Sequence, residues 1–357
     1  MSRKIIVECQ SGVREIALMD GKDLLYFHRD DPQPVQAEQI YLGKVDRMVK
    51  GVEAAFVQLN RELTGFLPYA ECPAPPRSGD RVLVQVKKPP VGEKAAYLTQ
   101  DISLAGRYAI YTPRTDRCAV SKRVDNPETK DRLLDIAHRL RPREGGLVMR
   151  LESAEAKEED VAQEVAALTQ KWARIREAAR AAAPGLMEEQ EDALSRLLRD
   201  EHGSIEEILT DDPAALPPLP LPIVQMDDPF SVYGVKSKLQ KSMQRKVWLD
   251  CGGYLVIDPT EALTVIDVNS GKFTGKKSGA EDTFLLLNLQ AAREIGRLLR
   301  LRNVGGIVIV DFVDMEREES RRAVQAEMEA ALRLDPVKTV VHGFTSLGLL
   351  EMTRKKT

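Results

Sequence analysis

Two apolar runs near the end of the chain constrain its fold most: ALTVIDVNSG at residues 262–271 and GGIVIVDFVDM at residues 305–315. Each run is rich in β-branched residues and is long enough to form a buried strand. Each also carries carboxylates, which are costly inside a sheet unless they are paired or hold a metal ion. The local rules for a core strand therefore fail in both runs, and such a conflict is typical of a functional site.

The alternation of side chains along a strand predicts which polar groups share a face. In the first run it places Asp267 and Asn269 on one face near the carboxyl end. In the second run it places Asp311 and Asp314 on opposite faces if the strand stays regular. An amphipathic helix is predicted between the runs, so the crossover should make the strands parallel and bring Asp267 and Asp311 to one edge of the sheet.

Two converging carboxylates beside an amide suit a hard, oxygen-seeking cation. We expect Asp267 and Asp311 to hold Mg²⁺, with Mn²⁺ as a substitute. Such an ion polarises a phosphate oxygen and supplies hydroxide, which is the chemistry of phosphodiester hydrolysis. Structural aspartates at strand ends are the alternative. The segment GKFTGKKS, residues 271–278, has no glycine five positions before its second Gly-Lys step, so it does not complete a P-loop.

Residues 37–104 contain several short strands separated by turns, which is typical of a small barrel. The segments YLGKV, AAFVQL and GFLPY resemble an S1-type barrel, an OB-fold that binds nucleic acid. In such a barrel Phe56 and Phe66 would stack on bases and Lys94 would contact a phosphate. The alternative is that both phenylalanines belong to the barrel core.

The remaining segments predict further elements and one basic stretch. An N-terminal hairpin that turns at Asp20-Gly21 should join a sheet completed elsewhere in the chain. Helices are expected at about residues 154–183 and 188–200. The segment VKSKLQKSMQRKVWL is expected to carry its lysines and Arg245 on a helix that steers a phosphate backbone towards the acids.

Composition limits the class of protein. A chain of 357 residues suggests two to three domains, and a net charge of -3 confines polyanion binding to local patches. The four cysteines have no metal-finger spacing, and no run approaches the length of a membrane span. A soluble cytoplasmic protein with no membrane partner is expected.

Several long segments resemble the ribonuclease E/G family. They are IYLGKVDR, TGFLPY, SLAGRY, SKRV, EALTVIDVNSGKFTGK, NLQAAREIGRLLRLRNVGGIVIVDFVDM and LGLLEMTRK. The resemblance implies an α+β multidomain fold in which an S1 barrel (residues 37–104) is inserted in an RNase-H-like subdomain (residues 1–36 and 185–243). A 5′-sensor-like region (residues 105–184) and a DNase-I-like catalytic subdomain (residues 244–357) complete the implied division.

The resemblance also implies site residues. Asp267 and Asp311 would hold the catalytic magnesium, Asn269 would orient the site, and Asp314 is left as a supporting acid. The expected RNA-binding residues are Phe56, Phe66, Lys94, Lys122, Arg123, Arg150 and Arg245.

Two departures from the family pattern alter the expectations. The family senses a 5′-monophosphate with an Arg-Thr step, whereas Arg150 precedes Leu151 here, so 5′-end dependence should be weak. The sequence ends at Thr357, ahead of the paired-cysteine zinc link of many members, so no structural zinc is expected; a homodimer through another surface stays open.

The sequence thus predicts a magnesium-dependent endoribonuclease that cuts single-stranded RNA in RNA processing or decay. The products would carry 5′-phosphate and 3′-hydroxyl ends. The alternative is a non-catalytic S1-domain protein of the same family that binds RNA without cutting it.

Overall fold

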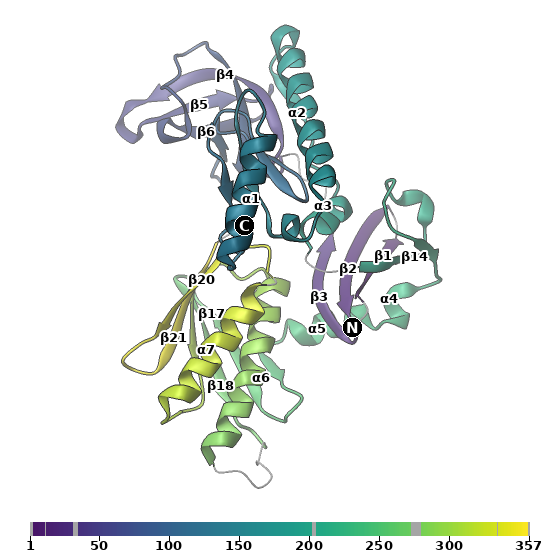
Figure 1. The fold of residues 1–357 in the computed structure, drawn as a ribbon, viewed down its shortest axis with the longest axis vertical. Coiled ribbons are helices and arrows are strands. Elements are labelled where there is room, and N and C mark those ends of the chain that lie inside the picture. The colour runs from purple at the N-terminus through teal and green to yellow at the C-terminus, as the bar shows by residue number, and fades with distance from the viewer. Residues whose placement is uncertain are drawn as a thin grey trace. The chain divides into compact units, whose positions relative to one another are not determined.

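The computed structural model describes residues 3–10, 12–30, 35–201, 205–272, 280–333 and 335–355. The fold is mixed α and β and divides into two compact units (Figure 1). The first unit combines Met1–Asp31 with Glu201–Thr357, and the second is the insertion Pro32–Asp200.

A five-stranded sheet of the first unit joins the N-terminal strands to strands that follow the insertion. Its order is β15-β14-β1-β2-β3, and β1 pairs with β14 in parallel. The prediction that the N-terminal hairpin joins a sheet completed elsewhere is therefore confirmed. The strands are β1 (Arg3–Gln10), β2 (Val13–Asp20), β3 (Asp23–Arg29), β14 (Ile205–Thr210) and β15 (Ile223–Gln225).

A six-stranded mixed sheet forms the rest of the first unit, in the order β16-β17-β18-β19-β21-β20. Two long helices, α6 (Ala280–Leu301) and α7 (Glu318–Arg333), run side by side against it (Figure 1). The strands are β16 (Lys246–Trp248), β17 (Tyr254–Pro259), β18 (Leu263–Asn269), β19 (Gly306–Asp311), β20 (Thr339–Phe344) and β21 (Leu349–Arg354).

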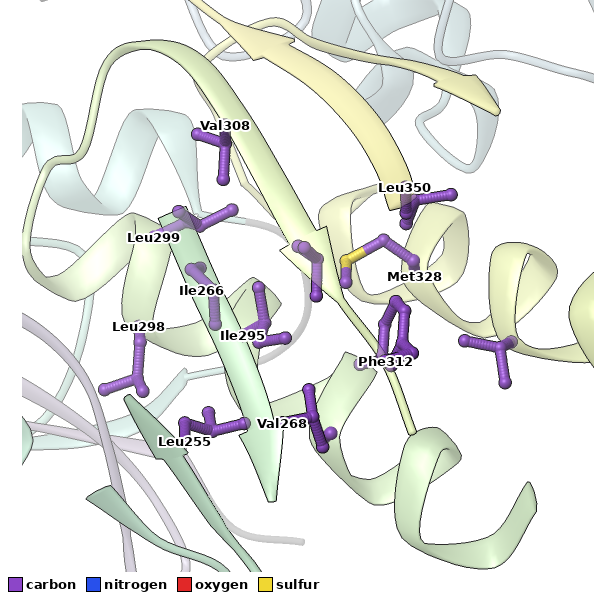
Figure 2. Close-up of a cluster of buried hydrophobic side chains, with 14 of the residues drawn as sticks. Leu255, Ile266, Val268, Ile295, Leu298, Leu299, Val308, Phe312, Met328 and Leu350 are labelled. Atoms are coloured by element: carbon purple, nitrogen blue, oxygen red, sulfur yellow. The ribbon is translucent and has the colours of Figure 1, made fainter. Parts of the chain in front are cut away.

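The core of this unit lies between the sheet and the two helices (Figure 2). Alternate residues of β18 and β19, among them Ile266, Val268 and Val308, point into it and meet Ile295 of α6 and Met328 of α7. Burying side chains of this size stabilises the fold by about 1.5–3 kcal/mol each, so the core fixes both strands on their helix-facing side.

A closed barrel of five strands begins the second unit. Its strands pair in the ring β4-β5-β6-β8-β7, and β7 pairs back onto β4. This closed barrel is consistent with an OB-fold. The strands are β4 (Ile40–Val49), β5 (Ala54–Gln58), β6 (Thr64–Pro68), β7 (Arg81–Lys88) and β8 (Ala96–Thr99). Strand β13 (Gly185–Glu188) pairs antiparallel with the first residues of β4.

A four-stranded sheet, in the order β11-β12-β10-β9, forms the rest of the second unit and shares a core with α1 and α2. Its strands are β9 (Leu104–Ala105), β10 (Ala109–Thr112), β11 (Ala119–Val120) and β12 (Gly146–Met149). The helices of this unit are α1 (Pro127–Leu140), α2 (Glu158–Ala181) and α3 (Ala193–Asp200).

Short helices complete the described chain. Two of them, α4 (Pro229–Val232) and α5 (Val235–Ser242), follow β15 in the first unit. The 3₁₀ turns are η1 (Lys50–Val52), η2 (Tyr69–Glu71), η3 (Leu151–Ala154) and η4 (Pro213–Ala215). No helix among the described residues combines the length and apolar character that crossing a bilayer requires.

Three sequence expectations about helices are corrected. The helix expected over residues 188–200 begins only at Ala193, because the Asp192 carboxylate accepts a hydrogen bond from the Leu194 N–H and starts the helix there. The helix expected from residue 154 begins at Glu158, after the η3 turn. The basic helix ends at Ser242, so Arg245 lies after the helix and Lys246 begins a strand.

The buried ion pair between Arg354 and Asp335 generates a stability prediction. The two side chains are 2% and 1% exposed, and Nε lies 2.6 Å from Oδ2. Arg354 also donates to Asn303 Oδ1 and to the Val304 carbonyl. Replacing Asp335 with Ala leaves a buried guanidinium without its counter-charge, so we expect a loss of about 3–5 kcal/mol in the free energy of unfolding.

Denaturant titration followed by circular dichroism would measure this loss. The matched control is Arg322→Ala, because Arg322 pairs with Glu318 on the exposed surface of the same unit and should cost about 0.5 kcal/mol. Equal losses for the two variants would show that the buried pair does not hold β21 in place.

Candidate functional site

The site consists of two acids that face each other across the central strand pair. Strands β18 and β19 run parallel, as predicted, and Asp267 lies directly opposite Asp311. Asn269 shares the face of Asp267, and its side-chain amide donates a 2.8 Å hydrogen bond to Asp267 Oδ2. The strand pairing therefore brings together the three polar residues that the sequence places at this edge.

The two strands are buried on one face only, which corrects the expectation of fully buried strands. Along β18, Thr264, Ile266 and Val268 are buried, whereas Val265 and Asp267 are exposed. The acids lie on the face that α6 and α7 do not cover. Water can therefore hydrate the carboxylates, which lowers the free-energy cost of placing charges in these strands. This open face also gives a ligand access to both carboxylates.

The carboxylates of the site repel one another. Burial, the carboxylate of Asp267 and the carboxylate of Asp314 all raise the pKa of Asp311 above its usual value. Strand β19 ends at Asp311, so Asp314 lies beyond the strand and does not take the opposite face as a regular strand would require. The carboxylate of Asp314 instead contributes to the raised pKa of Asp311. A divalent cation would relieve this repulsion.

The donor set fits magnesium chemistry. Two carboxylates with a supporting amide are the hard oxygen donors that Mg²⁺ takes, and this ion usually keeps several waters as its other ligands. Within the described ranges, no three His, Cys, Asp or Glu side chains are grouped closely enough to hold a metal by protein ligands alone. The residues present therefore suit a partly hydrated ion held by Asp267 and Asp311.

The barrel carries a row of aromatic rings outside its core. Phe56 and Phe66 are cross-strand partners with ring centroids 5.8 Å apart, and Tyr97 follows at 6.2 Å from Phe66. All three rings are half-buried, and the barrel core contains Ala55, Val57, Leu67 and Leu98 instead. The alternative that both phenylalanines are core residues is therefore wrong.

Sequence reasoning missed two members of this row. Tyr97 lies beside Phe66 because β6 pairs with β8, which only the closed barrel reveals. The guanidinium of Arg47 lies 4.6 Å from the centroid of Phe56, and the pairing of β4 with β5 places it there. A cation against an aromatic row is typical of a surface that binds single-stranded nucleic acid.

The other expected RNA-binding residues are divided between the two units of the fold. Lys94 is exposed in the turn before β8. Lys122 is exposed, and its neighbour Arg123 is half-buried beside Ser121. Arg245 makes a two-pronged ion pair with Asp258 on the surface of the first unit.

Arg150 makes its hydrogen bonds and ion pairs with residues of its own unit. Its guanidinium donates to the Gly106 carbonyl and to Asp200, each at 2.8 Å, and lies 3.7 Å from Glu152. Leu151, which follows it, packs against the core of the same unit. These contacts give Arg150 a structural role within the described residues, beside the RNA contact that the sequence suggests.

Comparison with known proteins identifies the family. The model of the ribonuclease E/G family matches residues 103–357, which include both acids of the site. Ribonuclease G of Salmonella typhimurium is 33% identical over 394 aligned residues, covering 100% of this chain and 80% of that relative. The chain belongs to the ribonuclease E/G family.

Other relatives from this family have similar sequence identity to this chain. Ribonuclease G of Haemophilus influenzae is 35% identical, covering 89% of this chain and 72% of its own length. Ribonuclease E of a Synechocystis strain is 32% identical, covering 90% of this chain and 52% of its own length. The alignment to the Salmonella protein spans the whole chain, so the barrel at residues 40–99 falls within it although it precedes the family-model match.

The contact between Arg150 and Asp200 predicts a pH-dependent stability. Burial alone would raise the pKa of Asp200, but hydrogen bonds and charges from Arg199 and Arg150 outweigh it and hold the pKa below its usual value. A lowered folded-state pKa contributes stability above the unfolded value, about 3.9, and this stability is lost as the pH falls through the folded value. Asp200→Asn should therefore cost about 1–3 kcal/mol at pH 7 and progressively less below about pH 4.

Urea unfolding at a series of pH values would check this prediction. Asp131→Asn, at an exposed acid of α1 in the same unit, is the matched control and should change the free energy of unfolding by less than about 0.5 kcal/mol. A loss for Asp200→Asn that stays constant down to pH 3 would contradict the ionic origin.

Proposed function

We propose that this protein is a magnesium-dependent endoribonuclease that hydrolyses phosphodiester bonds in single-stranded RNA and leaves 5′-phosphate and 3′-hydroxyl ends. The observation that carries the proposal is the position of Asp267 directly opposite Asp311 on an open sheet face. The relatives named Ribonuclease G and Ribonuclease E support the reaction class. The enzyme would act in RNA processing or decay.

Each residue of the site has a distinct part in this reaction. Asp267 and Asp311 would hold the ion, which when bound polarises the phosphate and supplies hydroxide. Asn269 would fix the orientation of the Asp267 carboxylate through its 2.8 Å hydrogen bond. The uncovered face of β18 and β19 would let an extended strand of RNA reach both acids.

The barrel would hold the RNA strand. Phe56 and Phe66 would stack on unpaired bases, and each stacked base contributes about 1–3 kcal/mol to binding. Tyr97 and Arg47 extend this surface, since they contact Phe66 and Phe56. Lys94, Lys122, Arg123 and Arg245 would contribute phosphate contacts.

The proposal also includes the subdomain division that the family resemblance implies, an oligomeric state and a substitute ion. They are the division into RNase-H-like, S1, 5′-sensor-like and DNase-I-like parts, assembly as a homodimer, and Mn²⁺ as a substitute ion. We also propose a cytoplasmic location, which agrees with the four free thiols of the chain.

A second candidate function is RNA binding without cleavage. The aromatic row of the barrel favours it, because stacking on three rings needs no metal ion. Cleavage assays in Mg²⁺ and in EDTA separate the two functions: binding in both conditions with cut RNA in neither would favour the second.

The acid pair generates the central prediction. Asp267→Asn and Asp311→Asn each remove one carboxylate from the ion, and we expect cleavage of a labelled single-stranded RNA to fall about 100-fold or more. Binding of the same RNA in EDTA should stay within about threefold, because the barrel is unchanged.

Glu261→Gln is the matched control for this measurement. Glu261 is an exposed acid in the turn before β18, at the opposite end of the strand from Asp267, and its replacement should leave the rate unchanged. Cleavage by both aspartate variants at the wild-type rate would overturn the assignment of the site.

The surroundings of Arg150 generate a prediction about the 5′ end. Its guanidinium is held by Gly106 and Asp200, and the next residue, Leu151, has no hydroxyl. We therefore expect a 5′-monophosphate to raise cleavage less than about twofold over a 5′-hydroxyl on otherwise identical RNAs, since phosphate binding needs several charge-assisted hydrogen bonds. Tenfold or greater stimulation by the monophosphate would show that the sensor works despite Leu151.

A further inference from the structure

Three side chains at one edge of the catalytic sheet form a cluster that the proposed reaction does not yet use. Trp248 of β16 and Tyr254 of β17 have ring centroids 5.2 Å apart. The ammonium of Lys246 lies 3.5 Å from the centroid of Tyr254 and 4.4 Å from that of Trp248. The cluster therefore combines two rings with one positive charge.

The cluster lies on the same open face as the acid pair. Val247 and Leu255 point into the core beneath the sheet, so Lys246, Trp248 and Tyr254 point to the other face. Strand pairing then places Trp248 beside Tyr254, and Tyr254 beside Asn269. Since neighbouring strands lie about 4.8 Å apart, Trp248 is about 10 Å across the sheet from Asn269, which is within the reach of a nucleotide.

Tyr254 also reaches the end of the catalytic strand. A Cβ at Gly271, just beyond Asn269, would lie 3.3 Å from Cδ1 of Tyr254, so the tyrosine ring lies against the backbone that follows β18. Tyr254 thus connects the cluster to the acid-bearing strand by contact as well as by register.

Exposure and charge distinguish this cluster from ordinary packing. Trp248 is 58% exposed, whereas the other tryptophan, Trp172, is 6% exposed in a core. The ammonium of Lys246 contacts the two rings and forms no ion pair with a carboxylate among the described residues, in contrast to its neighbour Arg245. An exposed ring beside an unneutralised cation suits a base and its phosphate.

We propose that Trp248, supported by Tyr254 and Lys246, stacks on an unpaired base of the RNA strand whose phosphate lies at Asp267 and Asp311. The proposal rests on the proposed function, because it takes its occupant from the strand that the acid pair would cut. Trp248 is then a positioning residue that holds a nucleotide a fixed distance from the cleaved bond and selects unpaired RNA over duplex.

Tryptophan fluorescence tests the contact without any cleavage. The chain has two tryptophans, and only Trp248 is exposed, so a short single-stranded RNA bound beside the acid pair should quench the emission. The measurement is made in EDTA on proteins that all carry Asp267→Asn and Asp311→Asn, because the neutral amides remove both the repulsion of the phosphate and the cleavage. The quenching should disappear in Trp248→Phe, and a duplex of the same sequence should quench less. Quenching that persists in Trp248→Phe, or no quenching in the protein that retains Trp248, would overturn the proposal.

Cleavage kinetics supply the second readout. Trp248→Ala should raise KM about tenfold with a smaller effect on kcat, and Trp248→Phe should restore most of the loss because a ring is retained. Val340→Ala is the matched control: Val340 is 39% exposed on the far edge strand β20, and its replacement should leave KM unchanged.

The outcomes separate this proposal from the proposed function. If the wild type cuts RNA and Trp248→Ala has the wild-type KM, the stacking contact is wrong and the endoribonuclease assignment stands. If the wild type leaves RNA intact in Mg²⁺, the endoribonuclease assignment fails, and loss of quenching in Trp248→Phe still supports the contact with RNA.

Discussion

The parallel pairing of β18 with β19 is the constraint on which the site depends. It sets Asp267 against Asp311, and the core beneath it, which includes Ile266 and Val308, prevents the strands from sliding. A slip of one residue would turn the acids towards α6 and α7 and the apolar residues towards water. The position of the carboxylates is therefore maintained by apolar packing on the opposite face of the same strands, and the mutual repulsion of the acids is tolerated because that packing outweighs it.

The described residues offer two surfaces for an RNA strand, and they differ in kind. The barrel presents rings in a row, with Arg47 against Phe56, which suits binding of any unpaired sequence. The catalytic sheet presents carboxylates, which repel a phosphate backbone until a cation neutralises them. Stacking on bases and holding a cation thus place opposite electrostatic demands on the protein. The barrel answers the first demand, and the sheet combines its acids with the cation and rings of Lys246, Trp248 and Tyr254 at one edge.

Local patterns predicted much of this site, and long-range pairing determined the rest. Alternation was enough to place Asp267 with Asn269, and the helix between the two runs was enough to make their strands parallel. The end of β19 at Asp311 could not be predicted, because nothing in FVDM breaks a strand locally. Tyr97 was missed because its pairing with Phe66 exists only once the barrel closes. The partner of Arg150 was missed because Asp200 lies 50 positions further along the chain.

The parallel pairing of β1 with β14 has a consequence for biosynthesis. Strand β1 leaves the ribosome before its partner β14, which follows an insertion of 169 residues, Pro32 to Asp200. At about 5–20 residues per second, β1 waits roughly 10–40 s for β14. During that time one edge of an apolar strand that includes Ile5, Ile6 and Val7 has no partner and can pair with other chains. The insertion can fold meanwhile, so the speed of translation across it sets how long the nascent protein is open to aggregation.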